Sequence, residues 1–357
     1  MCLGEGYWLN LSRTWGVNEC VKDRAVRGRL SAWVAAAVVA AVLGRAPAAV
    51  LAPAGLSNPF GVMLPPRLAE SEQGVEVAKV LGARFVRPQA VLTAQPEPSC
   101  PTCGRFQRAG FELVLTVRHT HQPREPAHPP TDLGSYRRTV EAVVTRYRPA
   151  LLVVENEENS ASLFYAGSPE EYASQLQVAC RAAHAHGVRC TNGGLVSRLT
   201  ALLTYFHYRD LGQLGRAEDF ARRVFPGPER RLVDSGQAAV QVDRGRRLLR
   251  SYRAAGADFV NFHWYESDPE ALREVVDSLR SQTGLPAVSN EMGQRTDDPA
   301  QTVAVMEQVV KSGLPVAVWF AMDGPQARGL VDPTGRLRAT GLAFQGFVRK
   351  HFPSPRP

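Results

Sequence analysis

The sequence predicts a single-domain (β/α)8 barrel with one insertion between strands five and six. From residue 59 onward, eight short apolar runs alternate with amphipathic helical patterns. The runs lack a polar face, which is typical of parallel strands that helices cover on both sides. No Gly-x-Gly-x-x-Gly motif follows the first run, so a doubly wound open sheet is disfavoured.

The predicted elements follow one another in the order that a barrel requires. The strands are 60–64, 84–87, 113–117, 151–154, 188–191, 259–263, 287–289 and 316–320. Helical patterns cover 74–81, 135–147, 169–186, 240–255, 269–281, 299–312 and 340–350. Ser168-Pro169 and Asp268-Pro269 each suit an N-cap followed by proline at the first helical position. Residues 209–235 are rich in Arg, Glu and Gly and weakly periodic, so we interpret them as the insertion.

Composition narrows the classes of function. The chain has 357 residues, of which 44% are hydrophobic and 21% charged, as in an ordinary globular protein. Its formal net charge is +8, but the basic residues form no patch interleaved with aromatic residues. Nucleic acid is therefore not an expected partner.

The first 52 residues resemble an export signal. Basic residues between Lys22 and Arg29 precede an apolar run at 30–43, and small residues follow at 46–49. The run of about 14 residues is short of the roughly 20 that span a bilayer. We therefore expect residues 1–52 to be an extension with a signal peptide, and 53–357 to be an exported barrel domain. The alternative is an uncleaved segment that holds the protein at the membrane.

Four cysteines lie in the predicted barrel. Cys100 and Cys103 form a lone Cys-Pro-Thr-Cys, and Cys180 and Cys190 flank a predicted helix-to-strand turn. A zinc site would need a second pair of ligands at suitable spacing. Outside the cell, two local disulfides are favoured over a metal site, although the sequence leaves the pairing open.

Polar and aromatic residues gather where the predicted strands end. Because the chemistry of a (β/α)8 barrel takes place at the carboxyl ends of its strands, these positions are the candidate site. The strands end in Arg87, Arg118-His119, Asn156-Glu157, Asn192-Gly193-Gly194, His263-Trp264-Tyr265, Asn290-Glu291, and Trp319 followed by Asp323. Carboxylates, cations, amides and aromatic faces together are what a sugar site requires.

Two of these strand ends each carry a glutamate, Glu157 and Glu291. Cleavage of a glycosidic bond needs two carboxyl groups, one as acid/base and one as nucleophile or water-activating base. The acidic run from Glu155 to Glu158 leaves the register open, because a slip would bring Glu155 or Glu158 into the site instead.

With these residues in place, roughly residues 57–350 resemble a retaining glycoside hydrolase of the (β/α)8 clan A. In that clan an Asn-Glu pair ends strand four and supplies the acid/base, which matches Asn156 and Glu157. A glutamate that ends strand seven is the nucleophile, which matches Glu291. The resemblance implies an oligosaccharide, polysaccharide or glycoside substrate, with no metal or organic cofactor.

Four further residues match the same clan: Arg87 after strand two, His263 and Tyr265 after strand six, and Trp319 in strand eight. Arg87 and Tyr265 would stabilise the carboxylate of Glu291 by charge and by hydrogen bonding. Asn156 would bind the 2-hydroxyl group of the sugar, and Trp319 would offer an apolar floor to its ring.

Two alternatives remain open. One is a barrel of the same clan that binds carbohydrate without cleaving it. The other is a metal-dependent barrel hydrolase that uses His119 and His121. Carboxyl groups about 5–5.5 Å apart would indicate retention at the anomeric carbon, and about 6.5–9.5 Å would indicate inversion.

Overall fold

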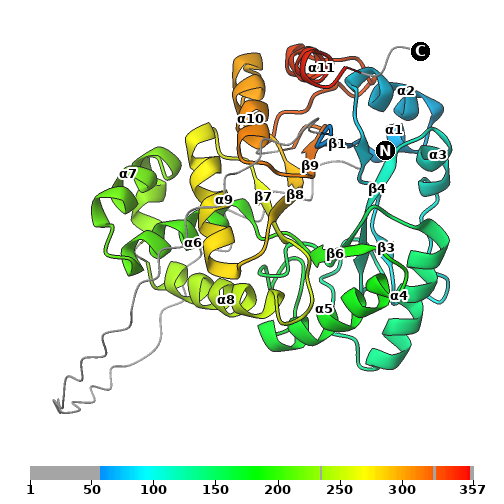
Figure 1. The fold of residues 1–357 in the computed structure, drawn as a ribbon, viewed down its shortest axis with the longest axis horizontal. Coiled ribbons are helices and arrows are strands. Elements are labelled where there is room, and N and C mark those ends of the chain that lie inside the picture. Colours follow the sequence, from blue (N-terminus) through cyan, green and yellow to red (C-terminus); the bar gives the residue numbers. More distant parts are fainter. Residues whose placement is uncertain (1–56, 234, 325–326, 354–357) are drawn as a thin grey trace, which may run out of the picture. The chain divides into compact units, whose positions relative to one another are not determined.

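Eight parallel strands form a nearly closed barrel, as the sequence predicts (Figure 1). The computed structural model describes residues 57–353, apart from 234, 325 and 326. The strands are β1 (Phe60–Met63), β2 (Phe85–Val86), β4 (Glu112–Arg118), β5 (Leu151–Val154), β6 (Arg189–Asn192), β7 (Val260–Trp264), β8 (Ala287–Met292) and β9 (Ala317–Phe320).

Hydrogen bonding joins neighbouring strands in the order β6-β5-β4-β2-β1-β9-β8-β7. Two isolated parallel bridges, Thr191 with Phe259 and Leu195 with Phe262, connect the β6 end of this order to the β7 end. A short additional strand, β3 (Val91–Leu92), pairs with β4. The carboxyl ends of all eight barrel strands therefore meet at one rim.

The predicted helices are confirmed, with ends that shift by a few residues. They are α2 (Glu72–Leu81), α4 (Leu133–Tyr147), α5 (Pro169–His184), α8 (Gly236–Tyr252), α9 (Pro269–Thr283), α10 (Pro299–Lys311) and α11 (Ala339–His351). Ser168 forms a capping box with Glu171 at the start of α5, and Asp268 accepts a hydrogen bond from the N–H of Ala271 at the start of α9.

The predicted insertion, residues 209–235, lies between the fifth and sixth barrel strands and is largely helical. It contains α7 (Leu214–Val224) and the 3-10 helix η1 (Gly227–Leu232), and it follows α6 (Ser197–Asp210). Neither α6 nor α7 begins with a side-chain cap, so the usual start signal is missing from the sequence. Two shorter helices, α1 (Pro66–Ala69) and α3 (Cys103–Arg108), were also not predicted.

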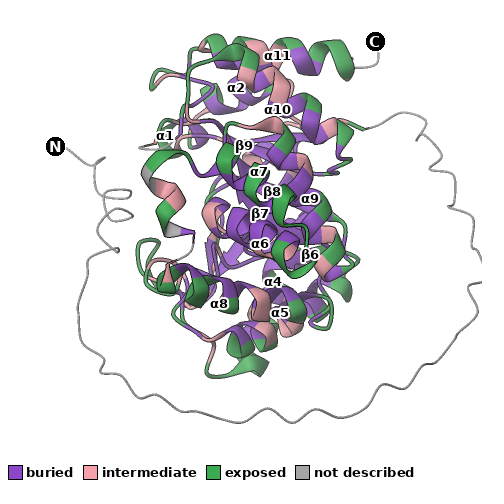
Figure 2. Ribbon diagram, turned by 90° about the vertical axis from the view of Figure 1, so that its left-hand side faces the viewer, coloured by how far each residue is buried: buried purple, intermediate pink, exposed green. Residues whose placement is uncertain are grey.

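The core has two parts, one inside the barrel and one between the strands and the helices. Buried residues run through the centre of the molecule, and the exposed residues lie on the outer helices (Figure 2). Strand β9 serves both parts, because successive side chains of a strand point to opposite faces. Val318 belongs to the inner cluster. Trp319 belongs to the outer one, where its ring packs edge-on against Phe344 of α11 at 5.7 Å.

Both local cysteine pairs form disulfides, Cys100 with Cys103 and Cys180 with Cys190. The second of these joins the end of α5 to β6. The predicted signal segment lies outside the described residues. Within residues 57–353, with the gaps named above, no helix has the length and apolar character needed to cross a bilayer.

Replacing Trp319 with alanine should lower the free energy of unfolding by about 3–5 kcal/mol, because the substitution leaves a cavity in the outer core. Leu342→Ala is the control, since Leu342 is 57% exposed on α11. That control should change stability by no more than about 0.5 kcal/mol. Denaturant titration of both variants measures the difference, and similar small effects would show that Trp319 is not a core residue.

Candidate active site

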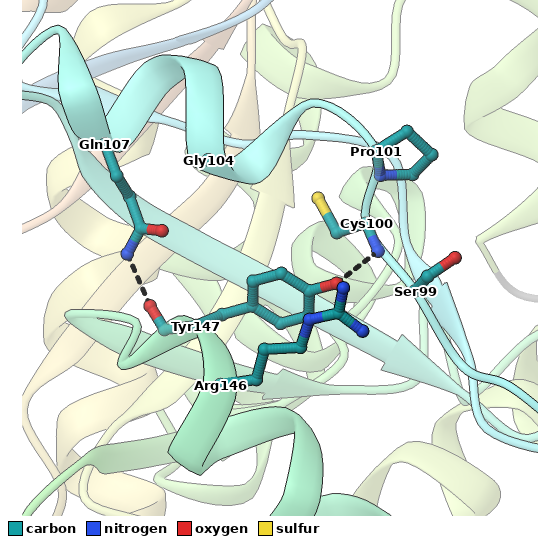
Figure 3. Close-up of a pocket in the computed structure, with 7 residues that line it drawn as sticks. All are labelled: Ser99, Cys100, Pro101, Gly104, Gln107, Arg146 and Tyr147. Atoms are coloured by element: carbon teal, nitrogen blue, oxygen red, sulfur yellow. Dashed lines mark hydrogen bonds between the residues drawn. The ribbon is translucent and has the colours of Figure 1, made fainter.

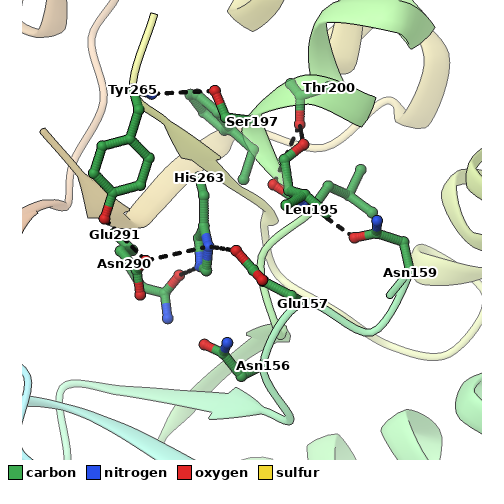
Figure 4. Close-up of polar contacts among 12 residues, drawn as sticks. Asn156, Glu157, Asn159, Leu195, Ser197, Thr200, His263, Tyr265, Asn290 and Glu291 are labelled. Carbon is green, nitrogen blue, oxygen red and sulfur yellow. Dashed lines mark hydrogen bonds and ion pairs between the residues drawn. The ribbon is translucent and has the colours of Figure 1, made fainter. Parts of the chain in front are cut away.

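The barrel brings together all of the predicted site residues except Trp319, at the carboxyl ends of four strands. Arg87 follows β2, and Asn156 and Glu157 follow β5. His263 lies in β7 with Tyr265 directly after it, and Glu291 lies in β8. Figure 4 shows Glu157, His263 and Glu291 pointing toward one another, with ligand-forming atoms within 4.8 Å of each other.

Arg87 and Tyr265 hold the Glu291 carboxylate from two sides. Arg87 Nη1 donates a hydrogen bond to Oε2 at 2.5 Å, and the Tyr265 hydroxyl donates to Oε1 at 2.9 Å. Burial by itself would raise the pKa of Glu291, but the charges of His263 and Arg87 and these two hydrogen bonds outweigh it. The pKa of Glu291 is therefore below its ordinary value, and the group is ionised at neutral pH.

The same guanidinium orients Asn156. Arg87 Nη2 donates to Asn156 Oδ1 at 2.7 Å. Because a guanidinium only donates, the oxygen of the amide must face it. The Nδ2 amide is then the group that Asn156 offers to a bound molecule.

A hydrogen-bonded row of asparagines fixes the ring of His263. Asn261 Oδ1 accepts from the backbone N–H of Asn290 at 2.9 Å, so its Nδ2 must be the atom that donates to Asn290 Oδ1 at 2.8 Å. Asn290 Oδ1 is thus an acceptor, and it lies 3.0 Å from His263 Nε2. The hydrogen of the neutral imidazole therefore resides on Nε2, and Nδ1 faces Glu157 at 2.9 Å.

The 2.9 Å contact between His263 Nδ1 and Glu157 Oε1 needs one proton to be a hydrogen bond, because an unprotonated Nδ1 and a carboxylate oxygen are both acceptors. That proton resides either on the carboxyl group, which then donates to a neutral imidazole, or on Nδ1 of an imidazolium. Burial would lower the pKa of His263, but the charge of Glu291 and the contact with Glu157 raise it above its ordinary value. The pair can therefore hold a proton beside Glu157 near neutral pH.

The structure resolves the register of the acidic run, because only Glu157 reaches the cluster. Glu155 Oε1 instead accepts hydrogen bonds from the backbone N–H of His119 at 2.8 Å and from Gln175 Nε2 at 2.6 Å. Glu158 Oε1 accepts from Asn192 Nδ2 at 2.8 Å and from the Tyr252 hydroxyl. Both side chains are fully buried. Neither one is a candidate for the acid/base.

Trp319 is a correction to the predicted site. Its ring is fully buried against Phe344, so it offers no face to a bound sugar. The strand alternation directs the next residue, Phe320, toward the site instead, where its ring packs edge-on against Tyr265 at 6.2 Å. The sequence prediction was right about the strand and wrong about its face.

Asn261 and Asn290 are the residues whose role the sequence prediction missed. Asn261 lies within the predicted strand 259–263, in a run that is otherwise apolar or aromatic up to His263. A buried amide in such a run needs hydrogen-bond partners, which is the signal that points to a polar network. Asn290 was noted beside Glu291 but given no function.

The site could offer ligands to a metal ion through Glu157, His263 and Glu291. Arg87 already provides the positive charge at Glu291, which makes the cluster a poor site for a second cation. Among the described residues, His119 and His121 belong to no group of three potential ligands. His119 Nδ1 instead lies 3.1 Å from the Thr93 hydroxyl.

A separate cavity of about 510 Å³ lies between α3 and the end of α4 (Figure 3). Tyr147 lines it: its hydroxyl oxygen accepts a hydrogen bond from the backbone N–H of Cys100 at 2.8 Å, and its carbonyl oxygen accepts one from Gln107 Nε2 at 2.5 Å. Because α4 leads into the amino end of β5, this cavity is at the opposite end of the strands from Glu157.

No protein-family model and no curated protein sequence matches this chain. Solved structures do resemble it. A glucosidase from Croceicoccus marinus has a TM-score of 0.58 and 14% identity, over 81% of this chain and 67% of that one. A monomeric beta-xylosidase from Caulobacter crescentus CB15 has a TM-score of 0.52 and 16% identity, over 80% and 67%.

A GH128 (subgroup VII) oligosaccharide-binding protein from Trichoderma gamsii also shares the fold, with a TM-score of 0.50 and 12% identity over 85% of this chain and 100% of that one. At these identities the similarity establishes the fold alone. The barrel architecture is therefore one that both glycosidases and an oligosaccharide-binding protein use.

The free energy of unfolding of the Glu155→Gln variant should fall less with rising pH than that of the parent protein. Burial raises the pKa of Glu155 to about 7, above the value of about 4.3 in an unfolded chain. The native state therefore binds the proton more tightly, and stability is lost as the pH rises from about 4.3 through 7. Glutamine does not titrate. The free energy of unfolding of the variant should therefore rise by on the order of 3 kcal/mol relative to that of the parent as the pH goes from 4 to 8.

Denaturant unfolding of the two proteins across that pH range measures the effect. A difference in unfolding free energy that does not change with pH would contradict a raised pKa for Glu155.

Proposed function

We propose that this chain is a glycoside hydrolase that cleaves β-linked O-glycosidic bonds with retention at the anomeric carbon. The observation that supports this most directly is the approach of the Glu157 and Glu291 carboxyl oxygens to within 4.8 Å. Such a distance fits a direct attack by one carboxylate and is too short for the intervening water of an inverting enzyme.

In the first step Glu291 Oε attacks the anomeric carbon while the bond to the leaving oxygen breaks. The proton of Glu157 goes to that oxygen, which departs as an alcohol, and a glycosyl-enzyme ester forms on Glu291. The lowered pKa of Glu291 keeps the nucleophile ionised for this attack. His263 keeps a proton at the Glu157 position.

In the second step the ionised Glu157 takes a proton from water, and the water oxygen attacks the anomeric carbon. The ester bond breaks, and Glu291 leaves as a carboxylate that Arg87 and Tyr265 stabilise. Two inversions at one carbon give net retention. The amide of Asn156 is placed to bind the sugar 2-hydroxyl, a contact that strengthens in the transition state.

A second candidate function is carbohydrate binding without catalysis. The similarity in fold to an oligosaccharide-binding protein favours it. We prefer the hydrolase because the two carboxyl groups have different environments. A cation and a phenol bind Glu291, whereas an imidazole binds Glu157, and such a division suits one nucleophile and one acid.

We also propose that the protein is exported, which the signal-like pattern in residues 1–52 supports. The two disulfides of the barrel agree with an oxidising compartment. Sequencing the amino terminus of the protein recovered from the producing cells and from their medium tests this. A chain that stays in the cytoplasm would contradict it.

The hydrolase proposal predicts that Glu157→Gln and Glu291→Gln each lower kcat on aryl β-glycosides or β-glucans by at least about 100-fold, because each removes an essential proton carrier or nucleophile. Glu274→Gln is the matched control, since Glu274 is a buried carboxylate of α9 that bonds to Arg216 and Arg223. The control should keep kcat within about threefold, as expected of a change outside the reacting groups.

Retention of full hydrolysis by both site variants would refute the assignment. Binding of oligosaccharide without turnover by the parent protein would support the binding function instead. Loss of activity in EDTA would favour a metal-dependent hydrolase.

A further inference from the structure

The turn that carries Glu157 is strained and therefore needs support from its surroundings. Glu155 and Glu157 have φ angles of 66° and 45°, in the left-handed region that residues other than glycine rarely adopt. Such a backbone conformation is unfavourable for a residue with a side chain and persists only where neighbouring contacts hold it. The contacts around Glu157 therefore determine whether its carboxyl group points into the site.

Glu158 follows Glu157 directly, and its side chain points away from the reacting groups. Its carboxyl group is fully buried and accepts hydrogen bonds from Asn192 Nδ2 at 2.8 Å and from the Tyr252 hydroxyl. Gly193 leaves the room that this carboxyl group occupies, because a Cβ at that position would lie 2.8 Å from Glu158 Oε2. The Glu158 carboxyl group thus occupies a closely packed, hydrogen-bonded position, although it takes no part in the proposed reaction.

The backbone of the same turn is fixed as well. Arg244 of α8 donates to the carbonyl oxygens of Glu158 at 3.0 Å and of Asn159 at 3.1 Å. Glu158 therefore connects the turn to α8 through both its side chain and its carbonyl group.

Glu158 also lies at one end of the asparagine row that orients His263. Asn192 donates to Glu158, and its carbonyl oxygen accepts from Asn261 Nδ2 at 2.9 Å. The same Nδ2 donates to Asn290, whose side chain meets His263. The row begins at Glu158, the residue after Glu157. At its other end it contacts His263, whose ring in turn contacts Glu157.

We propose that Glu158 is a positioning residue for the acid/base of the proposed hydrolase: its buried bonds to Asn192 and Tyr252 hold the strained turn and the asparagine row, and so keep Glu157 against His263. This inference rests on the proposed function for its kinetic consequence only. The geometric consequence, the contact between Glu157 and His263, can be measured without any activity.

The kinetic test compares two leaving groups. A 2,4-dinitrophenyl glycoside departs without protonation, whereas an alkyl glycoside needs the acid. Glu158→Leu removes the acceptor and should lower kcat/KM on the alkyl glycoside by about 10–100-fold, as expected of a misplaced catalytic group. On the dinitrophenyl glycoside it should stay within about threefold, because Glu291 keeps its partners.

Glu158→Gln retains an acceptor oxygen for Asn192 and Tyr252 and should restore most of the activity on the alkyl glycoside. Glu274→Leu makes the same substitution at a buried carboxylate outside the site. This control should lower stability without changing the ratio of kcat/KM on the alkyl glycoside to kcat/KM on the dinitrophenyl glycoside. If Glu158→Leu does not fold, Tyr252→Phe removes one of the two donors and should shift the ratio in the same direction.

The second readout is the pKa of His263, followed by NMR titration of its ring. Glu157 contributes to raising this pKa, so Glu158→Leu should lower it toward the value in Glu157→Gln. An unchanged His263 titration, or equal losses on both substrates, would overturn the inference. If the parent protein cleaves no glycoside, the proposed function fails, and the NMR titration alone decides the positioning role.

Discussion

The site depends on holding two buried carboxyl groups within 4.8 Å of each other. Two carboxylates at that distance repel one another, so each needs its own compensating partner. Glu291 has the Arg87 guanidinium and the Tyr265 hydroxyl. Glu157 has the His263 imidazole and the proton between them. This division keeps the free Glu291 ionised and places a proton partner beside Glu157, which is the asymmetry that the proposed reaction needs.

The parallel barrel makes this arrangement possible. Its strands deliver side chains from distant parts of the sequence to one rim, with Arg87 after β2, Glu157 after β5, and His263 and Glu291 in the neighbouring strands β7 and β8. The close approach then requires precise local support. Left-handed backbone at Glu155 and Glu157, the asparagine row under His263, and the buried side chain of Glu158 supply it.

Much of this was predictable from the sequence, because apolar strand runs and polar strand ends are local patterns. All eight barrel strands follow from them, and six of the seven predicted site residues lie together at one rim of the barrel. The features that the sequence did not predict depend on tertiary structure. The face of β9 decides whether Trp319 or Phe320 points to the site, and the uncapped helices α6 and α7 give no start signal. Which glutamate of the acidic run reaches the site depends on partners from distant helices: Gln175 of α5 binds Glu155, and Tyr252 of α8 binds Glu158.

The stereochemistry of the first product tests the central claim most directly. The proposed account requires that Glu291 attack the anomeric carbon and water then displace it, so each step inverts that carbon. Proton NMR of the sugar released from a β-glycoside, recorded before mutarotation, should therefore show the β-anomer forming first. The α-anomer as the first product would contradict the assignment of Glu291 as nucleophile and Glu157 as acid/base.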